Sequence, residues 1–307
     1  MNFNKFINEN NDVFQNIGFS STLSEAYAML YFEIDNDTIK QNIIEQCFFI
    51  CMENLKKYKI PCFYLINLKD INEPINKTNS QHFIWVAKMF YDYYKINKND
   101  KYLIISKNII DYLKNNHIIN NNFINWIDLN NKDTNVLSSI KYYAAIDIIY
   151  ELDICFFNNI LKTLDNHINN NIIYHIYNIN TNEKYNIDTP MDSHQCMELI
   201  EGLMNIYEIS NDISFYNKSI KIINDIIDSL VDDISVFSKL QVFYFIKKYN
   251  INIIKNNYLK LENFIKNIIN NYKTNNNIYV YTNNKDVDNI FGYIYLNRLI
   301  KNNYITF

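Results

Sequence analysis

Glycine, proline and arginine are scarce in this 307-residue chain, which contains 3 glycines, 3 prolines and a single arginine, Arg298. Phosphate-binding loops and nucleophile elbows depend on several glycines at fixed spacings, and neither pattern occurs. The HExxH signature of zinc hydrolases is also missing from the sequence. We therefore expect neither a nucleotide cofactor nor a bound metal ion.

Paired CxxC spacing is absent from the cysteines, which number 5 and are scattered along the chain. Without such pairs, neither a disulfide framework nor a zinc site is indicated. Cys47 and Cys51 stand four residues apart in an apolar helical run. We interpret them as reduced core residues, because free cysteine packs as a small hydrophobic side chain.

Long apolar runs and clusters of positive charge are missing too. No stretch approaches the roughly 18 apolar residues needed to cross a bilayer, and the N-terminus lacks the regions of a secretory signal. The net charge is −4 and the lysines are scattered, which argues against a nucleic-acid partner. We expect a cytoplasmic protein without membrane insertion.

Apolar and aromatic residues, by contrast, are abundant. Hydrophobic residues make up 48% of the chain, with 26 tyrosines and 20 phenylalanines, which is enough apolar surface for a large core. Asparagine runs at 120–122 and 169–171 fit polar loops shaped by the codon bias of an A/T-rich genome. We assign these runs no chemistry.

An internal repeat organises most of the chain. Four segments, 31–37, 94–100, 150–153 and 207–212, each run from a tyrosine to an aspartate, and a weaker copy surrounds 249–254. The aspartates at 37, 100, 153 and 212 are 63, 53 and 59 residues apart, about the length of two helices and a connection. In each copy an apolar helix ends near the tyrosine, and Asn or Asp caps a second helix.

Helical periodicity read outward from these turns predicts five helix pairs and a single last helix. The predicted ranges are 21–34 with 38–57, 79–96 with 100–115, 134–151 with 153–169, 191–209 with 213–231, 235–250 with 255–272, and 286–302. The first member of each pair is the more apolar, as expected of an inner ring. The sequence thus predicts an all-α (α/α)6-type toroid of about five and a half hairpins over 21–307, after an N-terminal arm at 1–20.

The connections between hairpins are longer than the turns within them. They span about 58–78, 116–133, 170–190 and 273–285, and long connections of this kind are often functional. In an up-and-down ring they gather on one rim, at the N-terminal ends of the inner helices. Short β-like runs at 62–66 and 172–177 predict ordered strands that shape a cleft there.

Two strings resemble the outer-helix entries of six-hairpin (α/α) toroid enzymes, which act largely on carbohydrates. They are Trp85…Tyr94-Lys-Ile-Asn-Lys-Asn-Asp100-Lys-Tyr-Leu and Ser193-His-Gln…Glu198…Gly202-Leu…Tyr207-Glu-Ile-Ser-Asn-Asp212. The resemblance covers most of residues 21–302 and implies the fold more than the reaction, because epimerases, glycosidases, glucuronyl hydrolases and lyases share this pattern.

The C-terminal part of D-glucuronyl C5-epimerases is similar in a further feature. An aromatic segment there precedes an inner helix that opens with an Asp-Tyr-His-like motif, and here Tyr174 and Tyr177 precede Met191-Asp-Ser-His194. Ser193 stands where that family has a tyrosine that contributes to proton transfer. This departure puts the epimerase reaction in doubt.

Polar residues at the expected rim are the candidates for chemistry. His194 and Glu198 are one helical turn apart and can act as an acid/base pair, although a buried structural pair has the same spacing. His82 begins the second inner helix and is the third candidate catalytic residue. Asp192 and Gln195 flank His194 as binding candidates, with a plain N-cap as the alternative for Asp192.

Aromatic and acidic residues complete the predicted cleft. Sugar C–H surfaces stack on aromatic rings, so Trp85 and Trp126, the only tryptophans, are interpreted as binding residues, with core packing as the alternative. Tyr174, Tyr177 and Gln81 are further candidates. Glu25 and Asp286 stand at the starts of the first and last inner helices, which are neighbours in a closed ring. They are interpreted as a carboxylate pair that could serve in glycoside cleavage. The alternative is two surface carboxylates that are stabilised by the helix dipoles.

These observations predict a carbohydrate-active enzyme that acts on a glycan or a uronate-containing sugar by acid/base chemistry, either epimerase-like or glycosidase/lyase-like. A catalytically inactive toroid that binds a peptide or glycan is the main alternative. A terpene-cyclase-like or lanthionine-cyclase-like enzyme ranks third, and the lack of a Cys/His metal cluster argues against the latter. The single Arg298 is one observation against a uronate, because guanidinium groups are the usual partners of carboxylates, although lysine or tyrosine hydroxyls could substitute.

Overall fold

The computed structural model describes residues 28–29, 31–61, 77–124, 126–128, 137–169, 172–185, 193–232, 236–275 and 285–305. Residues 28–29 and 31–33 are helical. The labelled helices are α4 (Asp37–Tyr58), α5 (Ser80–Asn97), α6 (Asp100–Asn116), α7 (Asp147–Leu152), α8 (Ile154–Leu161), α9 (Ser193–Ser210), α10 (Ile213–Asp232), α11 (Val236–Lys248), α12 (Lys255–Asn275) and α13 (Lys285–Lys301).

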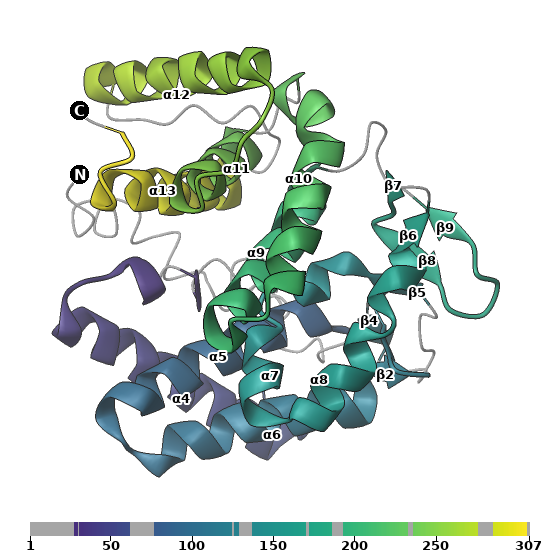
Figure 1. Ribbon diagram of the computed structural model, residues 1–307. Helices are drawn as coiled ribbons and strands as arrows, with labels where there is room; N and C mark the ends of the chain where they lie inside the picture. The colour runs from purple at the N-terminus through teal and green to yellow at the C-terminus, as the bar shows by residue number, and fades with distance from the viewer. Residues whose placement is uncertain are drawn as a thin grey trace.

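The helices form an inner and an outer ring, as Figure 1 shows for the pairs α5 with α6 and α9 with α10. The inner segments follow one another around the ring: 28–33, α5, α7 with the 3-10 turn Ile140–Tyr143 before it, α9, α11 and α13. Arg298 of α13 binds Glu33 of the first segment and closes the ring. The predicted (α/α) toroid of five pairs and a single last helix is confirmed.

Burial separates the two rings as the sequence predicts. In the inner helices α5 and α11, residues 83–87 and 240–246 are buried without interruption. The outer helix α10 buries only a stripe that includes Ile222, Ile223 and Ile226. Each fully buried side chain of this kind contributes about 1.5–3 kcal/mol to folding, so the hairpins depend on their neighbours for stability.

Asparagine and aspartate shape the hairpin turns. The side chains of Asn99, Asp153 and Asp212 accept hydrogen bonds from free amides at the starts of α6, α8 and α10. Left-handed backbone, which usually requires glycine, is provided by residues that include Asn211 (φ 57°) and Asn250 (φ 51°). The abundance of asparagine therefore compensates in part for the scarcity of glycine.

The third hairpin differs from its prediction. Residues 134–151 and 153–169 were expected to be two long helices, but the inner segment has only the 3-10 turn and the six residues of α7, and α8 ends at Leu161. Leu137–Ser139 form strand β5 instead, and a 3-10 helix at Leu164–His167 follows α8. The apolar periodicity of these segments is similar for buried helices and short strands, so it gave the wrong lengths.

Short strands occupy the connections, as predicted. They are β1 (Lys77–Asn79), β2 (Ile118–Ile119), β3 (Asn122–Phe123), β4 (Trp126–Asp128), β5 (Leu137–Ser139), β6 (Ile168–Asn169), β7 (Ile172–Ile173), β8 (Ile176–Asn178) and β9 (Lys184–Tyr185). All pairs are antiparallel: β1 with β4, β2 with β3, β6 with β7, and β8 with both β5 and β9. The predicted strand at 62–66 lies outside the described residues.

The cysteines of the described residues form no disulfide with one another, and Cys47 and Cys51 are buried, as expected of core residues. Cys47, Cys51 and Cys196 are buried and Cys155 is exposed. Burial raises the pKa of the Cys47 thiol far above its usual value. Among the described helices, none is both long and apolar enough to cross a membrane.

Candidate functional site

Each inner segment places a buried or mostly buried polar side chain among largely apolar neighbours. Lys88 and Arg298 expose only 18% and 15% of their side chains, and the other members are buried. In ring order the set is Glu33, Lys88, Asp147, Glu201, Gln241 and Arg298. Because a buried charge is costly unless it is paired, these residues organise into two partnered groups.

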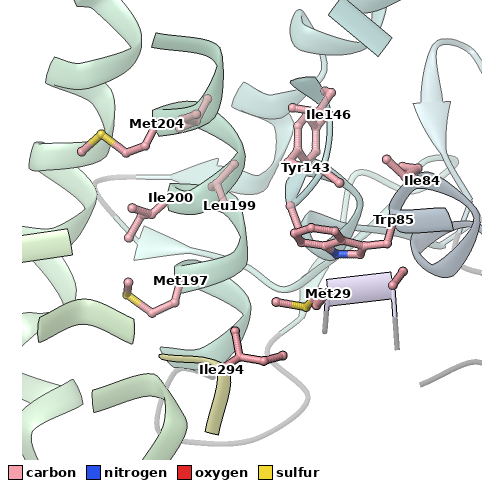
Figure 2. Packing of buried hydrophobic residues seen from close by; sticks show 14 of the residues in the cluster. Met29, Ile84, Trp85, Tyr143, Ile146, Met197, Leu199, Ile200, Met204 and Ile294 are labelled. Carbon is pink, nitrogen blue, oxygen red and sulfur yellow. The ribbon is translucent and has the colours of Figure 1, made fainter. Parts of the chain in front are cut away.

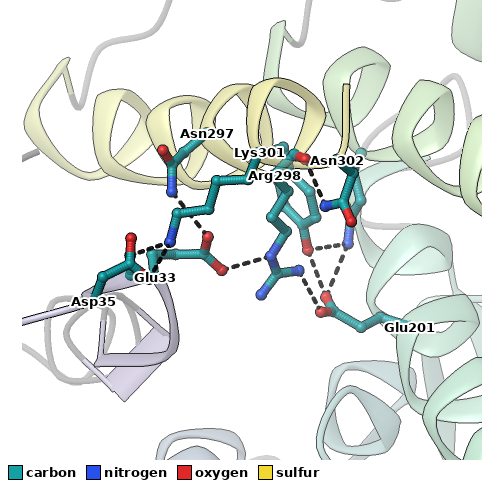
Figure 3. Close-up of polar contacts among 9 residues, drawn as sticks. Glu33, Asp35, Glu201, Asn297, Arg298, Lys301 and Asn302 are labelled. Carbon is teal, nitrogen blue, oxygen red and sulfur yellow. Dashed lines mark hydrogen bonds and ion pairs between the residues drawn. The ribbon is translucent and has the colours of Figure 1, made fainter. Parts of the chain in front are cut away.

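The first group centres on Arg298 (Figure 3). Its Nε lies 2.7 Å from Glu33 Oε1, and its Nη1 lies 2.9 Å from Glu201 Oε1. The Tyr295 hydroxyl donates to Glu201 Oε2 at 2.5 Å, and Gln241 Nε2 donates to the same oxygen at 3.2 Å. The only arginine of the chain therefore joins the first, fourth and sixth inner segments.

The pKa shifts of this group reflect burial and charge. Burial acts to lower the pKa of Arg298, but the carboxylates of Glu33 and Glu201 outweigh it and hold the pKa well above its usual value. Burial, followed by the charge of Glu201, raises the pKa of Tyr295 well above its usual value. The guanidinium and the phenol therefore stay protonated at neutral pH, and both act as hydrogen-bond donors to Glu201.

The second group joins α5 to α7. Lys88 Nζ lies 2.6 Å from Asp147 Oδ2 and 5.4 Å from the ring centre of Trp85. It also lies 5.9 Å from the ring centre of Phe32 on the first inner segment. Figure 2 shows the indole of Trp85 between Tyr143 and Met29, facing α9. Three inner segments thus meet around one ammonium group.

Glu198, a predicted catalytic residue, lies inside the ring. It is 6% exposed and stands on α9 one turn before Glu201. Its charge contributes, after burial and Glu201, to the raised pKa of Tyr295. His194 is one turn nearer the start of α9. The side chains of His194 and Gln195, and Asp192 altogether, lie outside the described residues.

The structure brings Trp126 to the start of α5. Strands β1 and β4 pair Asn79 with Trp126, and β1 leads directly into α5, which begins at Ser80. Gln81 and His82 form the first turn of α5, so their backbone lies beside Trp126 at the predicted rim. The side chains of these three residues lie outside the described set. Trp85, deeper on α5, is 2% exposed.

The remaining predicted residues are more dispersed. Tyr177 is buried in β8, and its hydroxyl donates to Asn182 Oδ1 at 2.5 Å in the turn before β9. Tyr174 is half-buried beside it, with Lys184 Nζ 5.9 Å from its ring centre. Asp286 is the second residue of α13, without a described side chain, and Glu25 lies outside the described residues.

A serine–histidine pair lies near the strands. Ser138 Oγ is 3.2 Å from His167 Nε2, and His167 Nδ1 is 3.1 Å from the Tyr174 carbonyl oxygen. Because a carbonyl only accepts, Nδ1 carries the proton and Nε2 accepts from the serine hydroxyl. Both residues are buried and both ring nitrogens of His167 have partners within the fold, so we interpret the pair as structural.

Acid is expected to destabilise the protein through its buried histidines. Burial is the main cause that lowers the pKa of His117 to about 3 and of His167 to about 4. In the unfolded chain a histidine titrates near pH 6.5. Below that pH the unfolded state binds more protons than the folded state, so the free energy of unfolding decreases as the pH is lowered. We expect each of these two histidines to lower the free energy of unfolding by about 2 kcal/mol between pH 7 and pH 5.

Urea unfolding at a series of pH values measures this loss. His117→Phe keeps a ring beside Phe83 and Tyr112 and should remove about half of the pH dependence between pH 7 and pH 5. A free energy of unfolding that stays constant over this interval would show that the histidines are not held neutral.

The sequence prediction missed most of the ring's polar residues, although it contained a signal. Lys88 is the only charged residue between Phe83 and Tyr91, and Asp147 interrupts an apolar run in the same way. A lone charge in a helix that is apolar on all sides indicates a buried, partnered group. Which partner it contacts depends on the ring geometry and is not visible in periodicity.

Comparison with known proteins supports the fold. No protein-family model matches the chain, and no curated protein matches it in sequence. A sugar epimerase from a ruminal bacterium superposes with a TM-score of 0.65 at 9% identity, covering 95% of this chain and 88% of the other.

Two further solved structures give similar values. An α-mannanase of glycoside hydrolase family 76 from Bacteroides thetaiotaomicron has a TM-score of 0.61 at 12% identity, covering 92% and 85% of the two chains. A D-mannose isomerase has a TM-score of 0.60 at 10% identity, covering 78% and 71%. At such identities the likeness concerns the fold alone. The chain therefore adopts the (α/α) toroid fold of these structures.

Proposed function

We propose that this protein is a carbohydrate-active enzyme that transforms a glycan by acid/base chemistry inside the ring. The observation that carries the proposal is Glu198, a carboxylate buried on an inner helix between the rim and the Arg298 group. Solved structures with this fold include a sugar epimerase, an α-mannanase and a D-mannose isomerase, which supports a sugar substrate.

The proposed roles follow the position of each residue. Glu198 transfers a proton at the reacting centre, with His194 one turn nearer the rim as its partner and His82 across the ring. Glu201 and Tyr295 fix the surroundings of Glu198 by hydrogen bonds. The substrate-binding residues of this proposal are Trp85, Trp126, Tyr174, Tyr177, Gln81, Asp192, Gln195, Glu25 and Asp286.

Turnover of sugars by the purified protein tests this function. The substrates are a panel of oligosaccharides and reducing sugars, and the products are resolved by chromatography and NMR in D₂O. New reducing ends identify hydrolysis, and deuterium at carbon identifies epimerisation or isomerisation. Glu198→Gln should lower the turnover at least about 100-fold, because it removes the proton-transferring group and keeps its shape.

Glu262→Gln is the matched control. Glu262 lies on the outer helix α12 and pairs only with Lys266 at 3.0 Å among the described residues, so its substitution should leave turnover unchanged. Equal activity of the Glu198→Gln variant would exclude Glu198 from the chemistry. Sugar binding without turnover of any substrate would favour the alternative of a catalytically inactive binding toroid.

A further inference from the structure

Two buried polar atoms beside Lys88 have no hydrogen-bond partner in the described part of the chain. They are the indole Nε1 of Trp85 and Oδ1 of Asp147, and their residues are 2% and 4% exposed. Buried polar groups in folded proteins nearly always have a partner, because an unsatisfied one is destabilising. These atoms therefore have unused hydrogen-bonding capacity that a polar ligand could satisfy.

The two atoms are complementary in kind. Trp85 Nε1 only donates, and Asp147 Oδ1 accepts, since Oδ2 of the same carboxylate is held by Lys88 Nζ at 2.6 Å. The ammonium group that holds Asp147 also lies 5.4 Å from the Trp85 ring centre, so Lys88 links the carboxylate to the aromatic ring. A hydroxyl group accepts and donates at once, and sugar C–H surfaces pack on aromatic faces.

We propose that Trp85, Lys88 and Asp147 form an interior subsite for an uncharged sugar unit, and that this subsite disfavours uronates. The proposal rests on the proposed function and names its substrate class. Lys88 positions the Asp147 carboxylate, Asp147 accepts a sugar hydroxyl, and the indole N–H donates to a sugar oxygen.

Selectivity against uronates follows from the charges inside the ring. Arg298, the only guanidinium of the chain, already binds Glu33 and Glu201. The ammonium group of Lys88 is paired with Asp147. The ammonium group of Lys239, which is buried on the inner helix α11, lies 4.5 Å from the ring centre of Phe264 on the outer helix α12. A sugar carboxylate would thus meet the field of Asp147 without a free guanidinium to bind it.

The fluorescence of Trp85 can report whether a sugar occupies the proposed subsite. Trp126→Phe leaves Trp85 as the only tryptophan of the chain and keeps an aromatic ring at the rim. The probes are two matched pairs, D-glucose with D-glucuronate and D-mannose with D-mannuronate. Within each pair the two sugars differ only at carbon 6, where the uronate carries a carboxylate. Neutral sugars should change the Trp85 emission saturably, and each uronate should bind at least about tenfold more weakly than its neutral partner.

Trp85→Phe is the second variant, with sugar binding measured by ligand-observed NMR. We expect sugar binding to be about tenfold weaker, because the indole donor is lost, and circular dichroism checks that the variant keeps its helical fold. The subsite is overturned by equal binding of uronates, by unchanged affinity of Trp85→Phe, or by no binding of the four sugars.

The test separates the subsite from the proposed function. Turnover that requires Glu198 but is unaffected by Trp85→Phe would refute the subsite and leave the enzyme assignment standing. Binding of neutral sugars that depends on Trp85, without turnover of any substrate, would support the subsite and refute the enzyme assignment.

Discussion

Replacement of Arg298 by methionine is expected to lower the free energy of unfolding by at least about 3–5 kcal/mol, the usual cost of removing one partner of a buried ion pair. Here one guanidinium serves two carboxylates, Glu33 and Glu201, whose side chains are 5% and 6% exposed. Both would be left in a poorly solvated interior. Urea unfolding followed by circular dichroism at pH 7 measures the effect.

A matched variant separates charge from packing. Methionine fills much of the space of the arginine stem, so Glu33→Gln and Glu201→Gln introduced together with Arg298→Met should restore most of the lost stability. Recovery would identify unpaired carboxylates as the cause. A triple variant as unstable as Arg298→Met alone would instead assign the loss to the contacts of Arg298 with the Tyr295 and Tyr244 rings, at 4.9 and 5.9 Å.

The same group connects ring closure to the candidate chemistry. Glu201 is one helical turn from Glu198 on α9, and Arg298 ties that turn to the first and last inner segments. Asn297 Nδ2 adds a hydrogen bond to Glu33 Oε2 at 3.2 Å. A toroid closed in this way restrains the turn of α9 that precedes Glu201 and carries Glu198, which the proposed acid/base role of Glu198 requires.

The architecture was predictable from the sequence because each hairpin turn has its own chemical signature. Asp153 and Asp212 cap α8 and α10, as the repeat predicted, and the observed starts at Ile154 and Ile213 follow directly. Local signals of this kind survive in a single sequence, because the cap satisfies amides of its own helix. The ring order of the hairpins then follows from their sequence order.

The third hairpin shows where local signals fail. The strand at Leu137–Ser139 exists because it pairs with Ile176–Asn178, about 40 residues later. Such pairing is a long-range contact that helical periodicity does not record. The same limit applies to the site. The apolar run around Lys88 indicates that this residue is buried, but only the assembled ring shows that its partner is Asp147.

Gly202→Ala is expected to destabilise the protein by about 3 kcal/mol or more, although alanine is the better helix former by about 1 kcal/mol. Gly202 is buried in the middle of α9, where a Cβ would lie 1.7 Å from the Tyr143 carbonyl oxygen and 2.7 Å from its carbonyl carbon. These are backbone atoms, so no side-chain rotation relieves the overlap.

Neither side of this contact is free to move. The Tyr143 hydroxyl bonds to Thr163 Oγ1 at 3.2 Å and donates to the Ile160 carbonyl at 3.3 Å, which anchors the 3-10 turn to α8. Movement of α9 would instead disturb Glu201, the next residue toward its start, and with it the Arg298 group. The clash therefore strains either the contacts of the 3-10 turn with residues 160–163 or the Arg298 group.

Asn205→Ala, three residues later on α9 and only half-buried, is the control for helix propensity. It should change the free energy of unfolding by no more than about 0.5 kcal/mol. Urea unfolding of both variants decides the question. If Gly202→Ala were as stable as the wild type, the backbones of α9 and the 3-10 turn would have to lie farther apart than the toroid places them, and the third inner segment would be wrongly positioned.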